Sequence, residues 1–251
     1  MLEVVLGMII PFMGTVVGSA LVFFMNGKLS EKLEKLLLGF SAGVMVAASI
    51  WSLLIPAIEQ GSRLGDWSFV PALIGLVLGF CALLMFDVFI EKCERKTENT
   101  KTDKMFFAMT LHNIPEGLAV GVAIAGFFYG DIGLSFASVI TLSIGIAVQN
   151  IPEGAIVSMP LRNLGHLKRK AFFKGVVSGI VEPISAVVAF LITGVVRSIL
   201  PYVLALAAGS MLYVVVTELV PESQEGGFSK VATLGFVLGF ALMMTLDVAL
   251  A

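Results

Sequence analysis

The sequence predicts an all-α polytopic membrane protein in which eight helices cross a bilayer. Hydrophobic residues make up 58% of the 251 residues, the mean hydropathy is +1.00 and only 14% of the residues are charged. A soluble chain of this length could not hide that much apolar surface in one core. Charged loops divide the chain into eight apolar stretches, each near the ~20 residues that a crossing needs: roughly 2–25, 36–57, 68–90, 105–128, 133–160, 171–196, 200–220 and 231–250.

The basic residues predict how these helices are oriented. With the N-terminus outside, the cytosolic loops hold 14 of the 16 Lys and Arg residues, and the outer loops hold only Arg63 and Arg197. Lys and Arg in short loops normally remain on the cytosolic side. We therefore expect both termini outside a cytoplasmic (inner) membrane, with residues 91–104 as a cytosolic loop. Residues 1–251 are expected to form one transmembrane domain.

Three glutamates lie where lipid would surround an ordinary helix. Glu116, Glu153 and Glu182 fall near the middle of the fourth, fifth and sixth stretches, and no Lys or Arg lies in the middle of any stretch. A charge at the bilayer centre costs about 2.5 kcal/mol or more, so such acids normally face a cavity or a partner. Protons, water or a mobile cation could be that partner here. The alternative, that protonated glutamates only join helices, does not explain three at one depth.

A repeated hexapeptide places polar groups beside two of these glutamates. HNIPEG (112–117) and QNIPEG (149–154) lie on consecutive, antiparallel helices. In each, the asparagine precedes the glutamate by three residues and the first residue precedes it by four, so the three side chains can share one face. The prolines free main-chain carbonyls, which Asn113 and Asn150 could cap. Alternatively, the polar side chains form the first shell of a divalent transition metal: His112, Asn113, Glu116, Gln149, Asn150, Glu153 and Glu182.

Internal repeats predict how the helices are arranged. GLVLGFCALLMFDV (75–88) returns as GFVLGFALMMTLDV (235–248) with seven of fourteen positions identical, and AGVM (42–45) returns as AGSM (208–211). Both copies of the longer segment contain G-x-x-x-G, which suits close helix packing. Five crossings separate the copies, so the copies run in opposite directions. The sequence therefore predicts a 3+2+3 inverted repeat, an arrangement typical of secondary transporters.

Both NIPEG motifs, followed by V-E-P in the next helix, are highly specific, and the whole chain resembles the ZIP (Zrt/Irt-like protein) family, in its GufA-like branch. The resemblance implies secondary transport of Zn²⁺, or of Cd²⁺, Fe²⁺ or Mn²⁺, into the cytosol by a homodimer with two adjacent metal positions. One position would use His112, Glu116, Gln149 and Glu153, with Met45 as a soft ligand; the other would use Asn113, Glu116, Asn150, Glu153 and Glu182. Relatives can carry His in place of Gln149 or Asp in place of Asn150, so the second position is expected to bind weakly.

Further carboxylates lie at the predicted helix ends. Glu59 and Asp247 fall at the outer ends of the second and eighth helices, and Asp87 and Glu222 at the inner ends of the third and seventh. Carboxylates at a pore mouth raise the local cation concentration, and the resemblance implies entrance and exit roles. Acids at a membrane interface are also common without any transport role. Glu218, one turn before Glu222, belongs either to the exit or to packing.

Two other functions remain as alternatives. A proton- or sodium-coupled carrier of another solute would be expected to show a basic or aromatic pocket, and no Lys or Arg lies within the spans. An intramembrane zinc enzyme would normally supply two or three nitrogen or sulfur ligands, whereas only one of the two histidines lies in a span. Nothing resembles a nucleotide-binding motif. We therefore expect no enzyme activity, prosthetic group, nucleotide or nucleic acid, and a divalent metal and the bilayer as partners.

Overall fold

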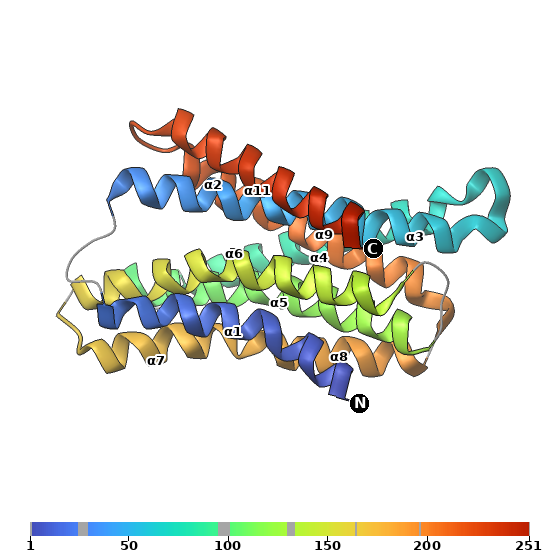
Figure 1. Ribbon diagram of the computed structural model, residues 1–251, viewed down its shortest axis with the longest axis horizontal. Helices are drawn as coiled ribbons and strands as arrows, with labels where there is room; N and C mark the ends of the chain where they lie inside the picture. Colours follow the sequence, from blue (N-terminus) through green and yellow to red (C-terminus); the bar gives the residue numbers. More distant parts are fainter. Residues whose placement is uncertain are drawn as a thin grey trace.

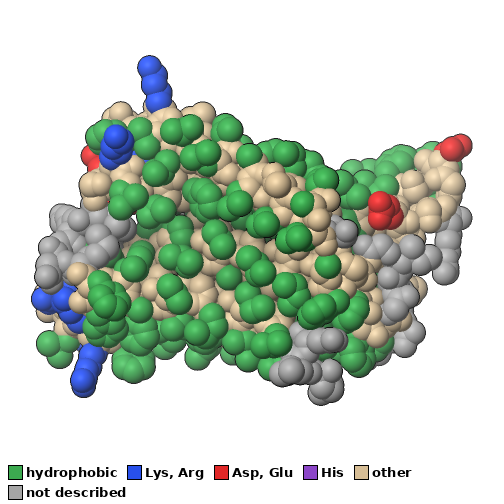
Figure 2. Space-filling model, viewed as in Figure 1, with side chains coloured by type: hydrophobic (Ala, Val, Ile, Leu, Met, Phe, Trp, Pro, Cys, Tyr) green, Lys and Arg blue, Asp and Glu red, His purple; other side chains and the backbone are tan. Residues whose placement is uncertain are grey.

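The computed structural model describes residues 2–24, 30–94, 101–129, 134–163, 165–195 and 197–250. These residues contain eight helical segments long and apolar enough to cross a membrane, which confirms the all-α, eight-span prediction. The helices run along the long axis of the molecule, and both termini lie at the same end (Figure 1). Apolar side chains cover much of the face shown in Figure 2, and the Lys and Arg side chains visible there lie at the end opposite to the termini.

The crossings follow one another in chain order. The first three are α1 (Leu2–Phe24), then α2 (Glu31–Ala48) with η1 (Ser49–Leu54) and α3 (Ile55–Gln60), and, after η2 (Gly61–Trp67), α4 (Phe69–Glu94). The middle two are α5 (Lys101–Phe128) and α6 (Phe136–Asn163). The last three are α7 (Lys168–Gly179) with α8 (Val181–Val195), then, after η3 (Arg197–Ile199), α9 (Leu200–Val214) with η4 (Val215–Leu219) and α10 (Val220–Gln224), and finally α11 (Ser229–Leu250).

The charged segment between the third and fourth crossings is shorter than the predicted loop 91–104. Residues 91–94 continue α4 and residues 101–104 begin α5, while residues 95–100 lie outside the described part of the chain. A helix satisfies its own main-chain hydrogen bonds and can therefore continue beyond the bilayer with polar side chains. Hydropathy marks only the apolar part of such a helix, which explains the difference.

Four helix pairs make the most extensive contacts: α2 with α11, α1 with α6, α4 with α9 and α5 with α8. Glycines line each of these pairs. A Cβ atom on Gly43 of α2 would lie 2.1 Å from the carbonyl oxygen of Phe236 in α11, and one on Gly209 of α9 would lie 2.1 Å from that of Leu76 in α4. Real Cβ atoms do not approach a carbonyl oxygen so closely, so glycine is what lets these backbones meet.

The glycine contacts follow the internal sequence repeat. In both copies of the longer segment, each glycine of G-x-x-x-G faces a carbonyl of the partner helix: Gly75 that of Tyr202, Gly79 that of Leu206, Gly235 that of Leu36 and Gly239 that of Phe40. The second and seventh crossings also contain matching π-helical segments, η1 and η4, each followed by a proline, Pro56 and Pro221. Two copies related by a two-fold axis would make such matched contacts, which supports the predicted inverted repeat.

The two helices that carry NIPEG occupy the middle of the bundle. In Figure 1, α5 and α6 lie between α2 and α11 on one side and α7 and α8 on the other. Their membrane spans are the most buried of the eight found in the described residues. By contrast, the apolar outer faces of α4, α8 and α11 are exposed, as lipid-facing surfaces are. Polar side chains on α5 and α6 are thereby shielded from lipid on nearly all sides.

Candidate metal site

The two NIPEG motifs face each other at the contact between α5 and α6. Both helices continue through their prolines, so each motif remains helical. The side chains predicted as polar ligands are all buried, none with more than 4% of its surface exposed: His112, Asn113, Glu116, Gln149, Asn150, Glu153 and Glu182. The sequence pattern therefore corresponds to one buried polar cluster in the middle of an apolar bundle.

Amide side chains connect glutamates of three helices. Gln149 Nε2 on α6 donates to Glu116 Oε1 on α5 at 2.7 Å, and Asn150 Nδ2 donates to Glu182 Oε2 on α8 at 2.9 Å. The carboxyl group of Glu116 also lies close enough to those of Glu153 and Glu182 to interact with them electrostatically. Three carboxyl groups thus share one buried region, and the two amide hydrogen bonds bring no positive charge to any of them.

Many atoms of the cluster have no hydrogen-bond partner among the described residues. These are Glu116 Oε2, both carboxyl oxygens of Glu153, the amide oxygens of Asn113, Gln149 and Asn150, and His112 Nδ1. Each buried polar atom left without a partner costs about 1–3 kcal/mol. Amide and carboxylate oxygens accept hydrogen bonds and donate none, so a further carboxylate could not satisfy them. A divalent cation with oxygen and imidazole ligands would satisfy several at once.

The side chains are not gathered around a single point. Within the described ranges, no group of three or more His, Cys, Asp or Glu residues lies close enough to hold a metal ion. The nearest carboxylate contact of His112 is with a residue outside the cluster, since its Nε2 lies 2.5 Å from Glu218 Oε2 on η4. His112, Asn113 and Glu116 were expected to share one face, but their polar groups contact three different elements, η4, α7 and α6.

The two asparagines do not cap the carbonyls that the prolines free. Asn113 Nδ2 donates at 2.8 Å to the main-chain oxygen of Ser178, where α7 ends. Asn150 Nδ2 approaches the main-chain oxygen of Pro11 in α1 at 3.3 Å, in addition to its bond with Glu182. Both nitrogens are therefore engaged on neighbouring helices. The two amide oxygens, which a metal would use, remain without a donor.

Met45 lies in the main apolar core and is completely buried on α2. Ser41, one turn earlier, donates to the main-chain oxygen of Gln149 at 3.1 Å. Residues four apart share a helix face, so the face that bears Met45 is the one turned toward α6. This placement fits packing in the apolar core, and the soft-ligand role stays a prediction.

Thr15 on α1 contacts the cluster, and the sequence reasoning missed it. Its hydroxyl donates to Glu182 Oε1 at 2.8 Å, and only 2% of the residue is exposed. The only signal in the sequence was a polar residue in the apolar run GTVVGSA. Such residues commonly bond their own helix backbone, so the pattern alone does not indicate a contact with another helix.

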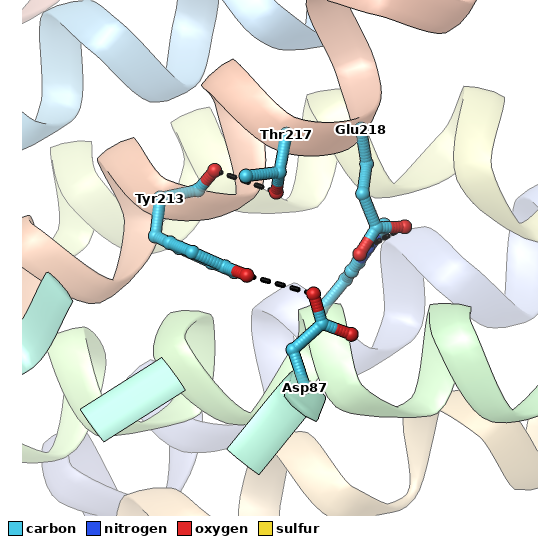
Figure 3. A network of polar contacts seen from close by, with 5 residues as sticks. Asp87, Tyr213, Thr217 and Glu218 are labelled. Atoms are coloured by element: carbon cyan, nitrogen blue, oxygen red, sulfur yellow. Dashed lines mark hydrogen bonds and ion pairs between the residues drawn. The ribbon is translucent and has the colours of Figure 1, made fainter. Parts of the chain in front are cut away.

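A cavity between α4, α5 and the seventh crossing adjoins the cluster. It is lined by apolar residues and by Asp87, His112, Tyr213 and Glu218. Tyr213 OH donates to Asp87 Oδ2 at 2.7 Å. Figure 3 shows Tyr213 and Glu218 projecting from the seventh crossing toward Asp87 on α4. The His112–Glu218 contact joins this cavity to the buried cluster, and Asp87 lies beyond it toward the end of α4.

The remaining carboxylates differ in their surroundings. Asp247, near the end of α11, is buried and accepts a hydrogen bond from Ser52 Oγ at 2.7 Å, while its Oδ2 has no partner among the described residues. Asp247 and Asp87 occupy matching positions of the sequence repeat, and a hydroxyl group bonds each of them. Glu59 on α3 and Glu222 on α10 are exposed, and Lys35 bonds the main-chain oxygen of Glu222.

Comparison with known proteins gives consistent matches. A sequence model described as "ZIP Zinc transporter" matches residues 105–247, which include both NIPEG motifs and Glu182. The chain is 37% identical to "Zinc transporter GufA" of Myxococcus xanthus, over 94% of this chain and 95% of that protein. It is 33% identical to "Zinc transporter ZIP11" of Xenopus tropicalis, over 99% and 97%, and 35% identical to "Zinc transporter ZIPB" of Bordetella bronchiseptica, over 98% and 81%.

Proposed function

Because this chain belongs to the ZIP zinc transporter family, we propose that it carries divalent transition-metal cations across the cytoplasmic membrane into the cytosol. The similar proteins are named as transporters and not as enzymes. Zn²⁺ is the first candidate, since the similar proteins are named for it. One observation carries the proposal: the buried side-chain oxygens around Glu116 and Glu153, and Nδ1 of His112, lack hydrogen-bond partners within the described residues.

We assign two adjacent metal positions to these atoms. The first would use His112, Glu116, Gln149 and Glu153, with Met45 beside them, and the second Asn113, Glu116, Asn150, Glu153 and Glu182. The amide groups suit both the metal-free and the metal-bound state of such a site. The nitrogen of Gln149 or Asn150 donates to a glutamate, while the oxygen of the same amide stays available to the cation. Zn²⁺ accepts nitrogen and oxygen ligands in this way.

His112 offers a route from the first position toward the cytosol. For His112 to bind a metal through Nε2, it must leave Glu218, and when the metal departs it can return. The cation would then pass Glu218 and Asp87 in the cavity that they line and reach Glu222. Asp247 and Glu59, near the other end of the bundle, would supply the entrance. The basic residues, concentrated in the loops at the exit end, support the inward direction.

Two structural proposals accompany this function. The matched glycine contacts of α2 with α11 and of α4 with α9 support an inverted repeat, which would let the same site open toward either side in turn. A homodimer is proposed from the family resemblance. A proton- or sodium-coupled carrier of another cation remains the second candidate, because the same carboxylates could bind protons or Na⁺.

The test is metal uptake by the purified protein in liposomes that contain a fluorescent metal indicator. We expect Zn²⁺ to enter without nucleotide and without sodium, and parallel assays with Cd²⁺, Fe²⁺ and Mn²⁺ give the preference. Glu116→Ala and Glu153→Ala should nearly abolish uptake, because each removes a charge that both metal positions share. Asn150→Ala is the matched control at equal burial and should slow uptake without abolishing it.

Uptake equal to that of empty liposomes for all four metals would contradict the transport proposal. Full activity of a folded Glu116→Ala protein would contradict the site. Uptake that appears only with an imposed sodium gradient would favour the second candidate.

A further inference from the structure

Glu182 differs from the other two glutamates of the cluster in its hydrogen bonds. Its Oε1 accepts from Thr15 Oγ1 at 2.8 Å and its Oε2 from Asn150 Nδ2 at 2.9 Å. Both oxygens of Glu153, and one oxygen of Glu116, have no donor among the described residues. Side chains of α1 and α6 therefore fix the Glu182 carboxyl group on both sides, while the other two glutamates are held less firmly.

Thr15 occupies on α1 the place that Glu182 occupies on α8. Asn113 donates to the main-chain oxygen of residue 178, four residues before Glu182, and Asn150 approaches that of residue 11, four residues before Thr15. A Cβ atom on the glycine that follows Glu116 would meet the main-chain oxygen of Glu182 at 2.2 Å, and one on the glycine that follows Glu153 would meet that of Thr15 at 2.4 Å. The two halves of the site thus match, with a hydroxyl where the other half has a carboxylate.

We propose that Thr15 is a positioning residue for the metal position that Glu182 serves, an inference that rests on the proposed function. Its hydroxyl holds the Glu182 carboxylate in one orientation, as outer hydrogen-bond partners commonly orient metal ligands. An oxygen that accepts one hydrogen bond keeps a second lone pair for a cation. The donor therefore does not block ligation, and it removes the freedom of the carboxylate to turn away from the metal.

Burial explains why one hydroxyl has this effect. Thr15 and Glu182 are 2% and 1% exposed, so no solvent can replace the lost donor. In a Thr15→Val protein, the Glu182 carboxylate would keep only the Asn150 bond and could turn about it. Since Asn150 is itself assigned to the same metal position, the loosened carboxylate would disturb a second ligand as well.

The experiment measures equilibrium Zn²⁺ binding to the purified full-length protein by calorimetry, together with the KM and maximal rate of uptake in liposomes. Thr15→Val keeps the shape of the side chain and removes the hydroxyl, and Thr15→Ser keeps the hydroxyl. Thr193→Val, at an equally buried threonine of α8 whose hydroxyl has no partner in the described residues, is the matched control. Glu182→Gln identifies the binding step that Glu182 serves.

We expect Thr15→Val to weaken that step about 10-fold or more, the usual effect of removing an outer partner of a metal ligand. KM should rise more than the maximal rate falls. Thr15→Ser should restore the parent affinity, and Thr193→Val should bind as the parent does. If Thr15→Val does not fold, Thr15→Ala takes its place, since a smaller side chain causes no new contact.

Several results would overturn the inference. They are a folded Thr15→Val protein with the parent affinity, equal losses in Thr15→Val and Thr15→Ser, and Zn²⁺ binding that Glu182→Gln leaves unchanged. A parent protein that neither binds nor transports any of the four metals would instead overturn the proposed function, so the two failures are distinguishable.

Discussion

Asn150 connects three parts of the site with one amide group. Its nitrogen donates to Glu182 and approaches the main-chain oxygen of Pro11, and its oxygen has no donor within the described residues. A neutral amide at this point donates to Glu182 and adds no fourth carboxyl group to the three that already share this buried region. The cost is one charge fewer for a bound cation, so this single side chain balances the stability of the metal-free protein against metal affinity.

Asn150→Asp should shift that balance in a measurable direction. It removes the donor to Glu182 and places two carboxylates together, so the metal-free protein should unfold at a lower temperature than the parent. Saturating Zn²⁺ should stabilise the variant more than the parent. Binding that is about 10-fold tighter adds about 1.4 kcal/mol by linkage, which corresponds to a rise in Tm of about 3–6 °C for a chain of this size. Thermal unfolding with and without Zn²⁺ measures both effects.

Asn150→Ala is the control, because it removes the same donor without adding a charge. It should lower the metal-free Tm and reduce the stabilisation by Zn²⁺. Equal stabilisation of the two variants by Zn²⁺ would show that the oxygen at position 150 is not a ligand.

At this scale the sequence predicted which residues are buried together but not how they pair. Spacing within a helix indicates which side chains can share a face, and the polar residues that it singled out on α5 and α6 are buried. The contact of His112 with Glu218 depends on a rotamer and on a helix about 100 residues away in sequence. Thr15 was missed for a related reason, since its partner lies on α8 and not on its own helix.

The helices are held in pairs by glycines that face main-chain oxygens. On α4 and on α11 these glycines form the same sequence pattern, G-x-x-x-G, and the pattern correctly predicted close helix packing. It could not identify the partner helix, because a glycine permits approach without attracting one particular neighbour. The pairing is visible only in the folded chain, where the glycines of both repeat copies face main-chain oxygens of their partner helices.

Gly79→Ala and Gly239→Ala should each destabilise the protein, and for the same steric reason. A Cβ atom at either position would lie 2.0–2.1 Å from a carbonyl oxygen, of Leu206 and Phe40 respectively, so the paired helices must separate. Overpacking of this kind typically costs about 1–3 kcal/mol. Thermal unfolding of the purified proteins in detergent should show a lower Tm for both variants.

Gly227→Ala is the matched control, since nothing lies within 4 Å of the added atom. It should leave the Tm unchanged. Parent-like stability of Gly79→Ala and Gly239→Ala would mean that the helix pairs are not in contact as described.

Over the whole molecule, charge and chain direction agree. Both termini lie at one end of the bundle and the visible basic side chains lie at the other (Figures 1 and 2). An even number of crossings requires both termini to lie at the same end, and the positive-inside rule explains why the basic side chains gather at the other end. The sequence predicted the number and approximate bounds of the spans because each is fixed by local hydropathy. Which end faces the cytosol depends on the loops alone and stays a prediction.

Cysteine labelling tests this orientation. In a protein with Cys81→Ala and Cys93→Ser, we expect Asp66→Cys to react with a membrane-impermeant maleimide in intact cells. Arg169→Cys should react only after the membrane is permeabilised, because it follows the fifth crossing on the basic side. Both residues are exposed on the protein surface, so a difference in labelling reports the side of the membrane and not burial within the protein. Labelling of Arg169→Cys in intact cells would reverse the orientation and with it the proposed direction of transport.

The pairing of the helices also constrains how the chain is made. None of the four glycine-lined pairs joins consecutive crossings, so every early helix leaves the ribosome before its partner exists. The spans of α5 and α6 have the lowest mean hydropathy of the eight and are the ones that the bilayer accepts least readily. When α6 is synthesised, α1 is already in place to receive it. When α5 emerges with Glu116, α8 has not yet been translated, so the nascent chain must shelter that glutamate for two further crossings.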